Sequence, residues 1–270
     1  MRLAIGCRLT YDLPQPTPML ALLNVHAERV DDLESPDRLF TEPYVPSEQY
    51  HDLFGNHLHR LVAPAGRFAI GTRGVIRDDG APDPVPTHAP QHPVEALPPE
   101  TLGFLLPSRY CESDSLSQTA WDLFGATPEG WARVQAVCDW VHDRLAFDYM
   151  SARGDRTAVG ALADGRGVCR DFAHLAVAFC RALNLPTRYC TGYISDVGVE
   201  PPRAEVMDFA AWIEVWLGGA WRTFDPRNNR PRRGRVLVGR GRDAADVPLT
   251  HGFGPATLVG FEVRCEPPSP

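Results

Sequence analysis

A proline-rich segment, residues 78–100, divides the chain into two parts with different sequence patterns. It has little apolar content, and this composition favours an extended surface connection over a packed element. We therefore expect a domain boundary just after it, near residue 105. The chain has 270 residues, 44% of them hydrophobic, which is enough for a core and for one large or two modest domains.

The part before the proline-rich segment is expected to be rich in β-structure. Short β-capable runs occur at residues 3–11, 20–30 and 67–77, with turn residues between them. Several short strands at such spacing predict a small antiparallel sandwich. We therefore assign residues 1–105 to an N-terminal β-sandwich-like domain.

The part after the segment begins with helices. Apolar residues at helical spacing predict one helix over residues 131–145, with Thr127 as its N-cap and Pro128 at its first position. A second amphipathic helix is expected over residues 165–185, and Pro186 ends it.

Strands follow these helices. They are expected at residues 187–194, 208–217, 220–225 and 257–265, with Gly218-Gly219 as the two-residue loop of a hairpin. Helices followed by strands indicate an α+β fold. We assign residues 106–250 to this core and residues 251–270 to a C-terminal loop and strand, which could return to one of the sheets.

Charge and cysteine usage restrict the function classes. The net charge of −7 argues against a dedicated nucleic-acid surface. Seven cysteines are scattered without a C-x-x-C pair, so neither a zinc site nor a disulfide framework is indicated. No run approaches the roughly 18 apolar residues of a membrane helix, and no secretory signal is evident. We expect a cytoplasmic protein without cofactor, metal, nucleic-acid or membrane partner.

Cys169 is the most informative cysteine. It lies in the first turn of a predicted helix, just after Gly165 and Gly167. A helix N-terminus stabilises negative charge and lowers thiol pKa values there. The preceding glycines would leave backbone N–H groups free to hold an oxyanion. The alternative is that Cys169 is a small buried hydrophobic residue, as most free cysteines are.

The Gly218-Gly219 hairpin places a carboxylate near position 210. With that loop, position 212 faces Asp225, and position 210 becomes its diagonal neighbour, with α-carbons roughly 7–8 Å apart. An imidazole at position 210 could reach the carboxylate, which is the orientation that a Cys-His pair requires. The residue there, however, is Ala210.

Several blocks of sequence together resemble the bacterial transglutaminase-like proteins. They are GVCRDFAHL at 167–175, GY at 192–193, AWIEV at 211–215 and WRTFDP at 221–226. The similarity covers roughly residues 120–250, and the first hundred residues resemble the β-rich region that precedes the core in bacterial members. The resemblance implies a papain-like fold, in which a helix carrying a nucleophilic Cys packs on an antiparallel sheet carrying His and then Asp.

The resemblance also implies roles for individual residues. Cys169 matches the nucleophile and Asp225 matches the Asp, whereas the position of the histidine that precedes the Ala-Trp pair in most members holds Ala210. General acid–base help is worth roughly 10²–10⁴ in rate, and losing a member of a cooperative catalytic unit can cost about 10⁶. Amide cleavage should suffer most, because it needs a proton donor, whereas thioesters or activated esters could still react.

Two other histidines could replace the missing imidazole. His174 is rotated by about 140° from Cys169 on the helix, so a buried structural role is expected for it. His251 lies in a Gly/Pro-flanked stretch that, in the family, runs beside the active-site cleft. His251 is therefore our candidate proton carrier, and the candidate catalytic set is Cys169, Asp225 and His251.

Three weaker signals have ordinary alternatives. His51, His57 and His59 could bind a transition metal, but histidines on a β-surface are the simpler interpretation. Seven arginines between residues 227 and 242 could attract phosphates or carboxylates, but a solvated edge is the safer interpretation. Trp212 and Glu214 are expected on the cleft-side face of the hairpin, as packing and a polar contact under the site.

Two functions follow from these observations. In the first, a cysteine hydrolase (a protease or amidase) forms a thioester between Cys169 and a peptide or glutamine amide, and water or an amine resolves it. The missing histidine would impair this enzyme. In the second, a catalytically inactive module keeps the cleft and uses it to bind a peptide or protein partner.

Overall fold

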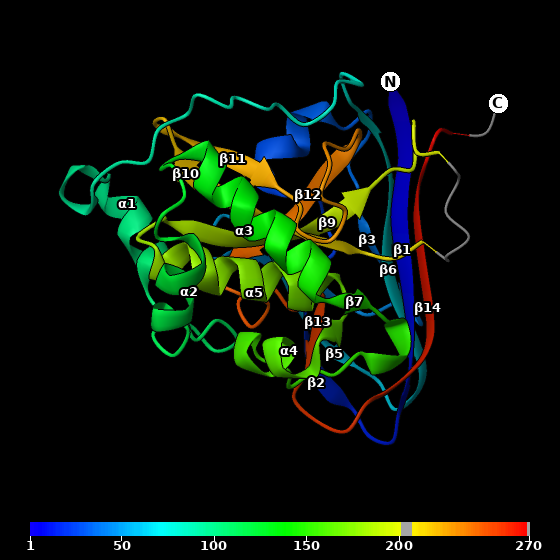
Figure 1. The fold of residues 1–270 in the computed structure, drawn as a ribbon. Helices are drawn as coiled ribbons and strands as arrows, with labels where there is room; N and C mark the ends of the chain where they lie inside the picture. Colours follow the sequence, from blue (N-terminus) through cyan, green and yellow to red (C-terminus); the bar gives the residue numbers. More distant parts are fainter. Residues whose placement is uncertain (201–206, 269–270) are drawn as a thin grey trace.

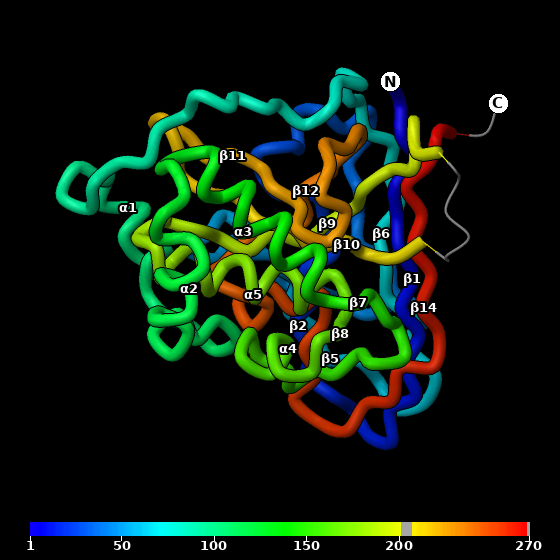
Figure 2. Tube along the Cα trace, viewed as in Figure 1, coloured from blue at the N-terminus to red at the C-terminus, as the bar shows by residue number. Residues whose placement is uncertain are grey.

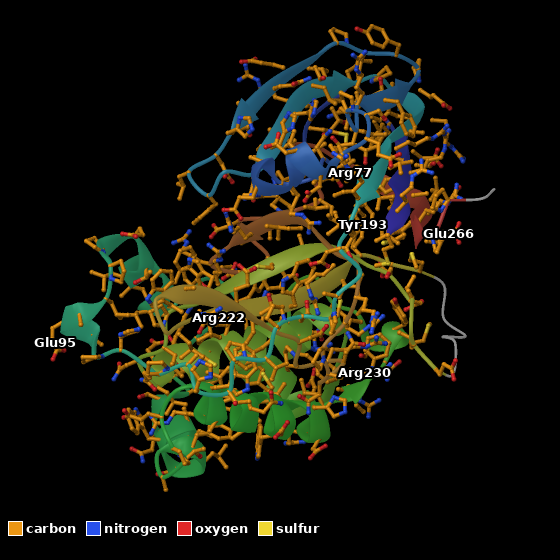
Figure 3. The ribbon with its side chains drawn as sticks, turned by 90° about the horizontal axis from the view of Figure 1, so that it is seen from above. Arg77, Glu95, Tyr193, Arg222, Arg230 and Glu266 are labelled. Atoms are coloured by element: carbon orange, nitrogen blue, oxygen red, sulfur yellow. The ribbon has the colours of Figure 1, made fainter. Side chains whose placement is uncertain are left out.

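The computed structural model describes residues 1–200 and 207–268, whose strands form three four-stranded sheets and one two-stranded sheet. Figure 1 shows the helices gathered on one side of the molecule and the long strands β1, β6 and β14 on the other. Seen from above, the sheet of β9–β12 lies between the helices and the N-terminal sheets (Figure 3). The fold is α+β with antiparallel sheets, as expected.

Two sheets build the N-terminal part, and both contain a strand from the C-terminal end of the chain. The first has the order β14-β1-β6-β3, with β1 Arg2–Leu13, β3 Leu39–Glu42, β6 Gly66–Arg77 and β14 Thr257–Glu266. The second has the order β13-β2-β5-β4, with β2 Thr17–Ala21, β4 Ser47–His51, β5 His57–Ala63 and β13 Thr250–Gly252. The C-terminal strand therefore returns to the N-terminal part of the fold.

The expected strand over residues 20–30 is only partly correct. β2 ends at Ala21, and a 3-10 helix, η1, covers Ala27–Asp32. His26 Nδ1 accepts a hydrogen bond from the backbone N–H of Glu28, 3.2 Å away. Such local bonds between side chain and backbone compete with a strand ladder, and they turn the chain here.

The proline-rich segment crosses the molecule as an extended chain. It follows β6 and contains only short helical turns, η2 Val94–Ala96 and the start of α1 Pro99–Leu102, which continues into η3 Gly103–Leu105. Figure 2 shows its course over the top of the molecule towards α1. Its polar groups hold it on the core: Gln91 donates to the Leu183 carbonyl at 3.0 Å, and His92 accepts from Gly219 N–H at 3.1 Å.

Four main helices cover one face of the third sheet. They are α2 Ser117–Phe124, α3 Trp131–Arg144, α4 Ala158–Asp164 and α5 Cys169–Ala182. The prediction that Thr127 is the N-cap and Pro128 the first residue of this helix is wrong, because α3 begins only at Trp131. Gly130 before it has φ 86°, and a Cβ there would lie 2.5 Å from the Ala89 carbonyl oxygen. The chain therefore turns into the helix at a position that requires glycine.

The third sheet has the order β11-β10-β9-β12, with β9 Thr187–Ile194, β10 Ala210–Leu217, β11 Ala220–Phe224 and β12 Arg235–Gly241. The hairpin prediction is confirmed: Gly218 and Gly219 have φ 59° and 76°, and Leu217 pairs with Ala220. Such positive values at both loop positions match the twist of the strands and favour glycine.

The two faces of β10 point into different clusters. Ala211 and Ile213 belong to the main core, against which α5 packs. Ala210 and Trp212 belong to a smaller cluster with Cys190, Ile194 and Leu237 on the other face.

The short strands β7 Ala146–Phe147 and β8 Arg166–Gly167 pair in parallel just before α5. Within the described residues, no helix is long and apolar enough to cross a membrane.

Candidate active site

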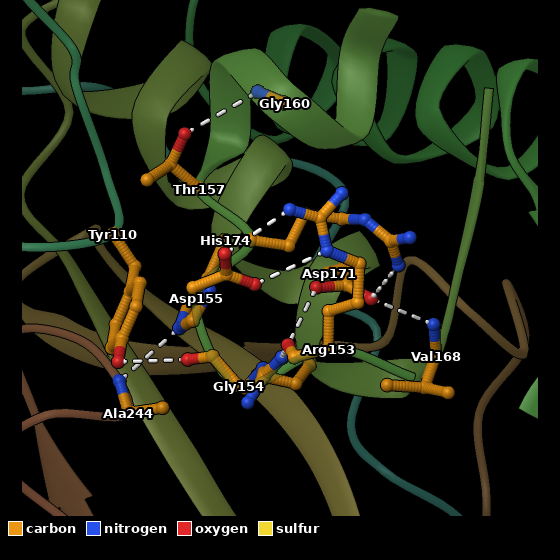
Figure 4. A network of polar contacts seen from close by, with 12 residues as sticks. Tyr110, Arg153, Gly154, Asp155, Thr157, Gly160, Val168, Asp171, His174 and Ala244 are labelled. Carbon is orange, nitrogen blue, oxygen red and sulfur yellow. Dashed lines mark hydrogen bonds and ion pairs between the residues drawn. The ribbon is translucent and has the colours of Figure 1, made fainter. Parts of the chain in front are cut away.

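Cys169 is the first residue of α5, and a buried carboxylate fixes the chain at this point. Asp171 Oδ2 accepts from the Val168 backbone N–H at 2.9 Å and from Arg156 Nη1 at 3.0 Å. Figure 4 shows the contact between Asp171 and Val168 as a dashed line. An acidic side chain in the first turn satisfies an otherwise unpaired helix N–H and matches the helix dipole. Arg170 also pairs with Asp171, with 3.6 Å between Arg170 Nη2 and Asp171 Oδ1.

The thiol of Cys169 lies on the wall of a small cavity of about 40 Å³. Its wall is formed by Phe147, Tyr149, Cys169, Ile194, Asp196, Met207, Asp208, Phe209, Ala210, Ala211, Arg227 and Asn228. A volume of this size holds a few water molecules at about 10–15 Å³ of accessible volume each. It could take a small side chain of a partner, but not a folded surface.

The Cys169 thiol is protonated at neutral pH. Burial and then the charge of Asp208 raise its pKa to about 11, although the Ala211 backbone N–H and Arg227 act in the opposite direction. The thiol also lies 3.8 Å from the Phe209 carbonyl oxygen, to which it donates. Four pH units below that pKa, only about one thiol in ten thousand is ionised. The expectation that the helix N-terminus lowers this pKa is therefore wrong, because desolvation outweighs the dipole.

Asp225 follows β11 and does not line the Cys169 cavity. Its Oδ1 accepts from the Asn228 backbone N–H at 2.9 Å, and its Oδ2 accepts from Asn228 Nδ2 at 2.8 Å. Arg235 Nη2 donates to the same Oδ2 at 3.2 Å. Asn228 lines the cavity, so it links the two expected site residues. Asp225 is within electrostatic reach of the thiol, because its charge contributes to the raised pKa of Cys169.

Position 210 lies on the cavity wall and carries only the methyl group of alanine. Within residues 1–200 and 207–268, no histidine lines this cavity. His251 instead lies on β13 opposite Leu20, with its ring centroid 4.8 Å from that of Phe253. This placement does not support His251 as the proton carrier.

His174 has the buried structural role that was expected. Its Nε2 accepts from the Ala244 backbone N–H at 3.1 Å, as Figure 4 shows, and its ring stacks on Tyr110 with centroids 5.2 Å apart. Burial lowers the pKa of His174 well below its usual value. A neutral ring that accepts at Nε2 carries its proton on Nδ1.

Several residues of the cavity were not singled out from the sequence. Asp208 and Phe209 come directly before Ala210, so closeness to the motif could have indicated them, whereas Arg227 was noted only as a member of the arginine cluster. Phe147 and Tyr149 lie in the connection between α3 and α4, where no motif indicates them. The Arg227 guanidinium lies 4.0 Å from the Phe147 ring centroid.

The interpretation of the arginine cluster as a solvated edge is wrong for several of its members. Arg232 and Arg240 are buried, at 3% and 8% exposed. Arg232 pairs with Asp196 at 2.9 Å, Arg240 with Glu28, and the buried side chain of Arg235 with Asp83 at 2.8 Å. These arginines join the third sheet to distant parts of the chain, so they do not form an exposed basic surface.

Two further sequence signals have structural explanations. His51, His57 and His59 stack along β4 and β5, with ring centroids 5.2 and 5.0 Å apart. In the described parts of the chain, no group of three His, Cys, Asp or Glu side chains is placed to hold a metal ion. Trp212 and Glu214 lie on the face of β10 away from α5, where Glu214 accepts from Arg188 Nε at 2.6 Å.

Alkylation of Cys169 should require strongly alkaline pH. Because its pKa is raised to about 11, we expect a reaction rate with iodoacetamide at pH 8.5 on the order of 100-fold below that of a free thiol of pKa about 8.5. The rate, followed by mass spectrometry, should rise through pH 11. The other six cysteines are buried, and Cys169→Ser should remove the modification. Rapid alkylation at pH 7 would contradict this assignment.

Comparisons with known proteins agree with the fold. Residues 118–226 match the model of the transglutaminase-like superfamily. An uncharacterized protein of Mycobacterium leprae is 34% identical over 127 residues, 44% of this chain and 43% of that protein. An uncharacterized protein of Mycobacterium tuberculosis is 38% identical over 98 residues, 32% of this chain and 30% of that protein. The matches thus span less than half the length of these relatives.

A solved structure matches over nearly the whole chain. The crystal structure of a putative cysteine protease from Cytophaga hutchinsonii superposes with a TM-score of 0.83 at 29% identity, covering 98% of this chain and 90% of that one. The similarity therefore includes the N-terminal sheets as well as the helices and the third sheet.

Proposed function

The chain contains a core of the transglutaminase-like superfamily, and we propose that this core is catalytically inactive and binds a peptide segment of a partner protein in the Cys169 cavity. The observation that carries the proposal is the combination of a thiol of pKa about 11 with Ala210 in the place of a base. Amide cleavage requires a thiolate for attack and a proton donor for the leaving nitrogen. Among the described residues of the cavity wall there is no histidine, which is the group expected to act as base and proton donor beside the thiol.

The walls of the cavity suit a small side chain of an extended peptide. The wall has aromatic surface and charged groups of both signs, with two carboxylates and one guanidinium: Phe147, Tyr149 and Phe209, then Asp196 and Asp208, then Arg227. Tyr149 is 43% exposed and Met150 beside it is 94% exposed, so apolar surface continues outside the cavity. An apolar pocket with a few polar groups is typical of a recognition site.

Selection of peptides from a random-sequence display library tests the proposal. We expect the wild type and Cys169→Ala to enrich the same peptides, because the thiol itself is not needed. Cys169→Leu, which fills the cavity, should weaken binding of those peptides by tenfold or more. Failure to enrich any peptide, or hydrolysis of a peptide or glutamine amide that Cys169→Ala abolishes, would overturn the proposal.

A second candidate is slow acylation of Cys169 by an activated ester or thioester. It is favoured by one observation: the thiol lies on the cavity wall, where the Ala211 backbone N–H faces it. An aryl ester would acylate the sulfur without needing a proton donor for its leaving group. Mass spectrometry of the wild type and Cys169→Ala after incubation with p-nitrophenyl acetate at alkaline pH separates this candidate from pure binding.

We also propose a cytoplasmic location. All seven cysteines are free thiols, and disulfides form and persist mainly in oxidising compartments. A reducing compartment therefore suits this chain, and cell fractionation with an antibody against it tests the proposal.

A further inference from the structure

Asp225, the expected catalytic carboxylate, belongs to a buried cluster of alternating charge. Arg235 Nη2 lies 3.2 Å from Asp225 Oδ2 and 2.8 Å from Asp83 Oδ2, while Arg235 Nε donates to Asp83 Oδ1 at 3.1 Å. Side-chain exposure is 2% for Asp225, 8% for Arg235 and 15% for Asp83. The attraction between such charges is strong in a desolvated environment, and removing one partner leaves the other charge buried at a high cost in free energy.

Arg235 projects from the face of the sheet that carries position 210. Gly192 of β9 pairs with Ala210 on one side and Leu237 on the other, and Ile194 pairs with Arg235. Because residues two apart share a face, these side chains all lie on one side of the sheet. The Arg235 guanidinium is 4.7 Å from the Trp212 ring centroid, and Ala210 packs in the same cluster as Trp212.

We infer that Arg235 is a positioning residue that replaces the missing imidazole as the cationic partner of Asp225, and that Asp83 ties the proline-rich segment to this pair. The inference rests on the proposed absence of catalysis. Arg235 donates to Asp225 Oδ2 and its positive charge repels a second cation there, so an imidazolium beside Asp225 is stabilised less than it would be without the guanidinium. Two features therefore oppose catalysis at this site. Ala210 provides no base, and Arg235 opposes a second cation beside Asp225.

Asp83 gives the cluster a structural purpose. Besides Arg235, it accepts from the Arg232 backbone N–H at 2.9 Å, and its own N–H donates to the Arg232 carbonyl at 2.9 Å. The segment that leads from the N-terminal sheets is therefore fixed to the chain beside the Cys169 cavity. Asp225, which could orient a base, instead pairs with the Arg235 that holds Asp83 and the proline-rich segment in place.

Restoring the histidine with and without Arg235 tests the inference. In Ala210→His alone, Arg235 should keep the new imidazole neutral and leave the Cys169 thiol pKa near its wild-type value. In Ala210→His/Arg235→Met, Asp225 is free to stabilise an imidazolium, which in turn stabilises a thiolate. We expect the thiol pKa, measured from the pH dependence of alkylation, to fall at least one unit further in the double variant, a tenfold gain in thiolate.

The matched control is Ala210→His/Arg242→Met, because the Arg242 side chain is half exposed and pairs with Asp246 instead. It should behave as Ala210→His alone. Arg235→Met leaves two buried carboxylates without their cation, so a second variant, Ala210→His/Arg235→Gln/Asp83→Asn, keeps neutral hydrogen-bonding groups at both positions. It should reproduce the fall in thiol pKa.

Equal thiol pKa values in Ala210→His and in the folded Arg235 variants would overturn the inference. A supporting readout is the imidazole pKa at position 210, measured by NMR, which a purely structural role of Arg235 would leave unchanged. The outcome is independent of peptide binding and amide hydrolysis by the wild type. Failure of the proposed function and failure of this inference are therefore distinguishable.

Discussion

Arg181→Met is expected to lower the free energy of unfolding by about 3 kcal/mol or more, because it removes the donors to three carbonyl groups at roughly 1–3 kcal/mol each. Arg181 is 2% exposed at the end of α5. It donates to the carbonyls of Leu106, Thr187 and Arg242 and to the hydroxyl of Ser108. These groups come from three different parts of the chain, around residues 106–108, 187 and 242, so the side chain joins α5 to its surroundings. Urea denaturation followed by circular dichroism measures the change.

Arg60→Met is the matched control for this substitution. The Arg60 side chain is 65% exposed and pairs with an equally exposed Glu48 on the neighbouring strand. Exposed ion pairs contribute roughly 0–1 kcal/mol, so this variant should unfold close to the wild type. If Arg181→Met were no less stable than Arg60→Met, the hydrogen bonds of Arg181 would not contribute to the fold as described.

Three of the four strands of the third sheet, β9, β10 and β11, were predictable because their sequence signals are local, whereas β12 was not predicted. Residues 187–194 form β9 with the expected bounds, and the Gly218-Gly219 loop fixes the register of β10 against β11. A two-residue loop allows only one alignment of its flanking strands, so residues 213 and 224 must face each other. The helix with Cys169 in its first turn follows equally from apolar spacing and from Pro186.

The arginine cluster was misinterpreted because the partners of buried arginines lie far away in the sequence. Arg240 pairs with Glu28 and Arg235 with Asp83, which are separated from them by 212 and 152 residues. A run of arginines looks the same whether it faces water or distant carboxylates. Only the three-dimensional placement of β12 against the N-terminal sheets and the proline-rich segment reveals the pairing.

The sign of the Cys169 pKa shift was also beyond the sequence. The helix N-terminus, which lowers a thiol pKa, is visible in the pattern, whereas the burial of this sulfur and the carboxylate of Asp208 are not. Desolvation of this partly buried sulfur raises its pKa, and the end of the helix acts more weakly in the opposite direction. Sequence motifs therefore located the candidate nucleophile correctly on α5 but could not predict its protonation state.

Acidification from pH 6.5 to pH 4 is expected to destabilise the fold, with about 3 kcal/mol of the loss coming from His59 alone. His59 is 1% exposed, and its Nε2 and Nδ1 lie 3.0 Å from Asn24 Oδ1 and 3.1 Å from Ser47 Oγ. Burial and the neighbouring His57 lower the pKa of His59 to about 4. Its pKa is higher in the unfolded chain, near 6.5, so below that pH the unfolded state binds more protons and stability falls until the folded-state pKa is reached.

Urea denaturation at pH 7, 5.5 and 4 measures this loss, and two variants isolate the imidazole. His59→Gln removes the titrating group, so its unfolding free energy should fall less steeply with pH, by about one proton per molecule between pH 6 and 4.5. Ser47→Ala removes one hydrogen bond to the ring but keeps the ring, so it should lower stability at every pH and leave the slope unchanged. The buried His174, whose pKa is also lowered, adds to the acid sensitivity of all three proteins. If His59→Gln kept the full wild-type slope, the buried neutral state of His59 would not be the source of the acid sensitivity.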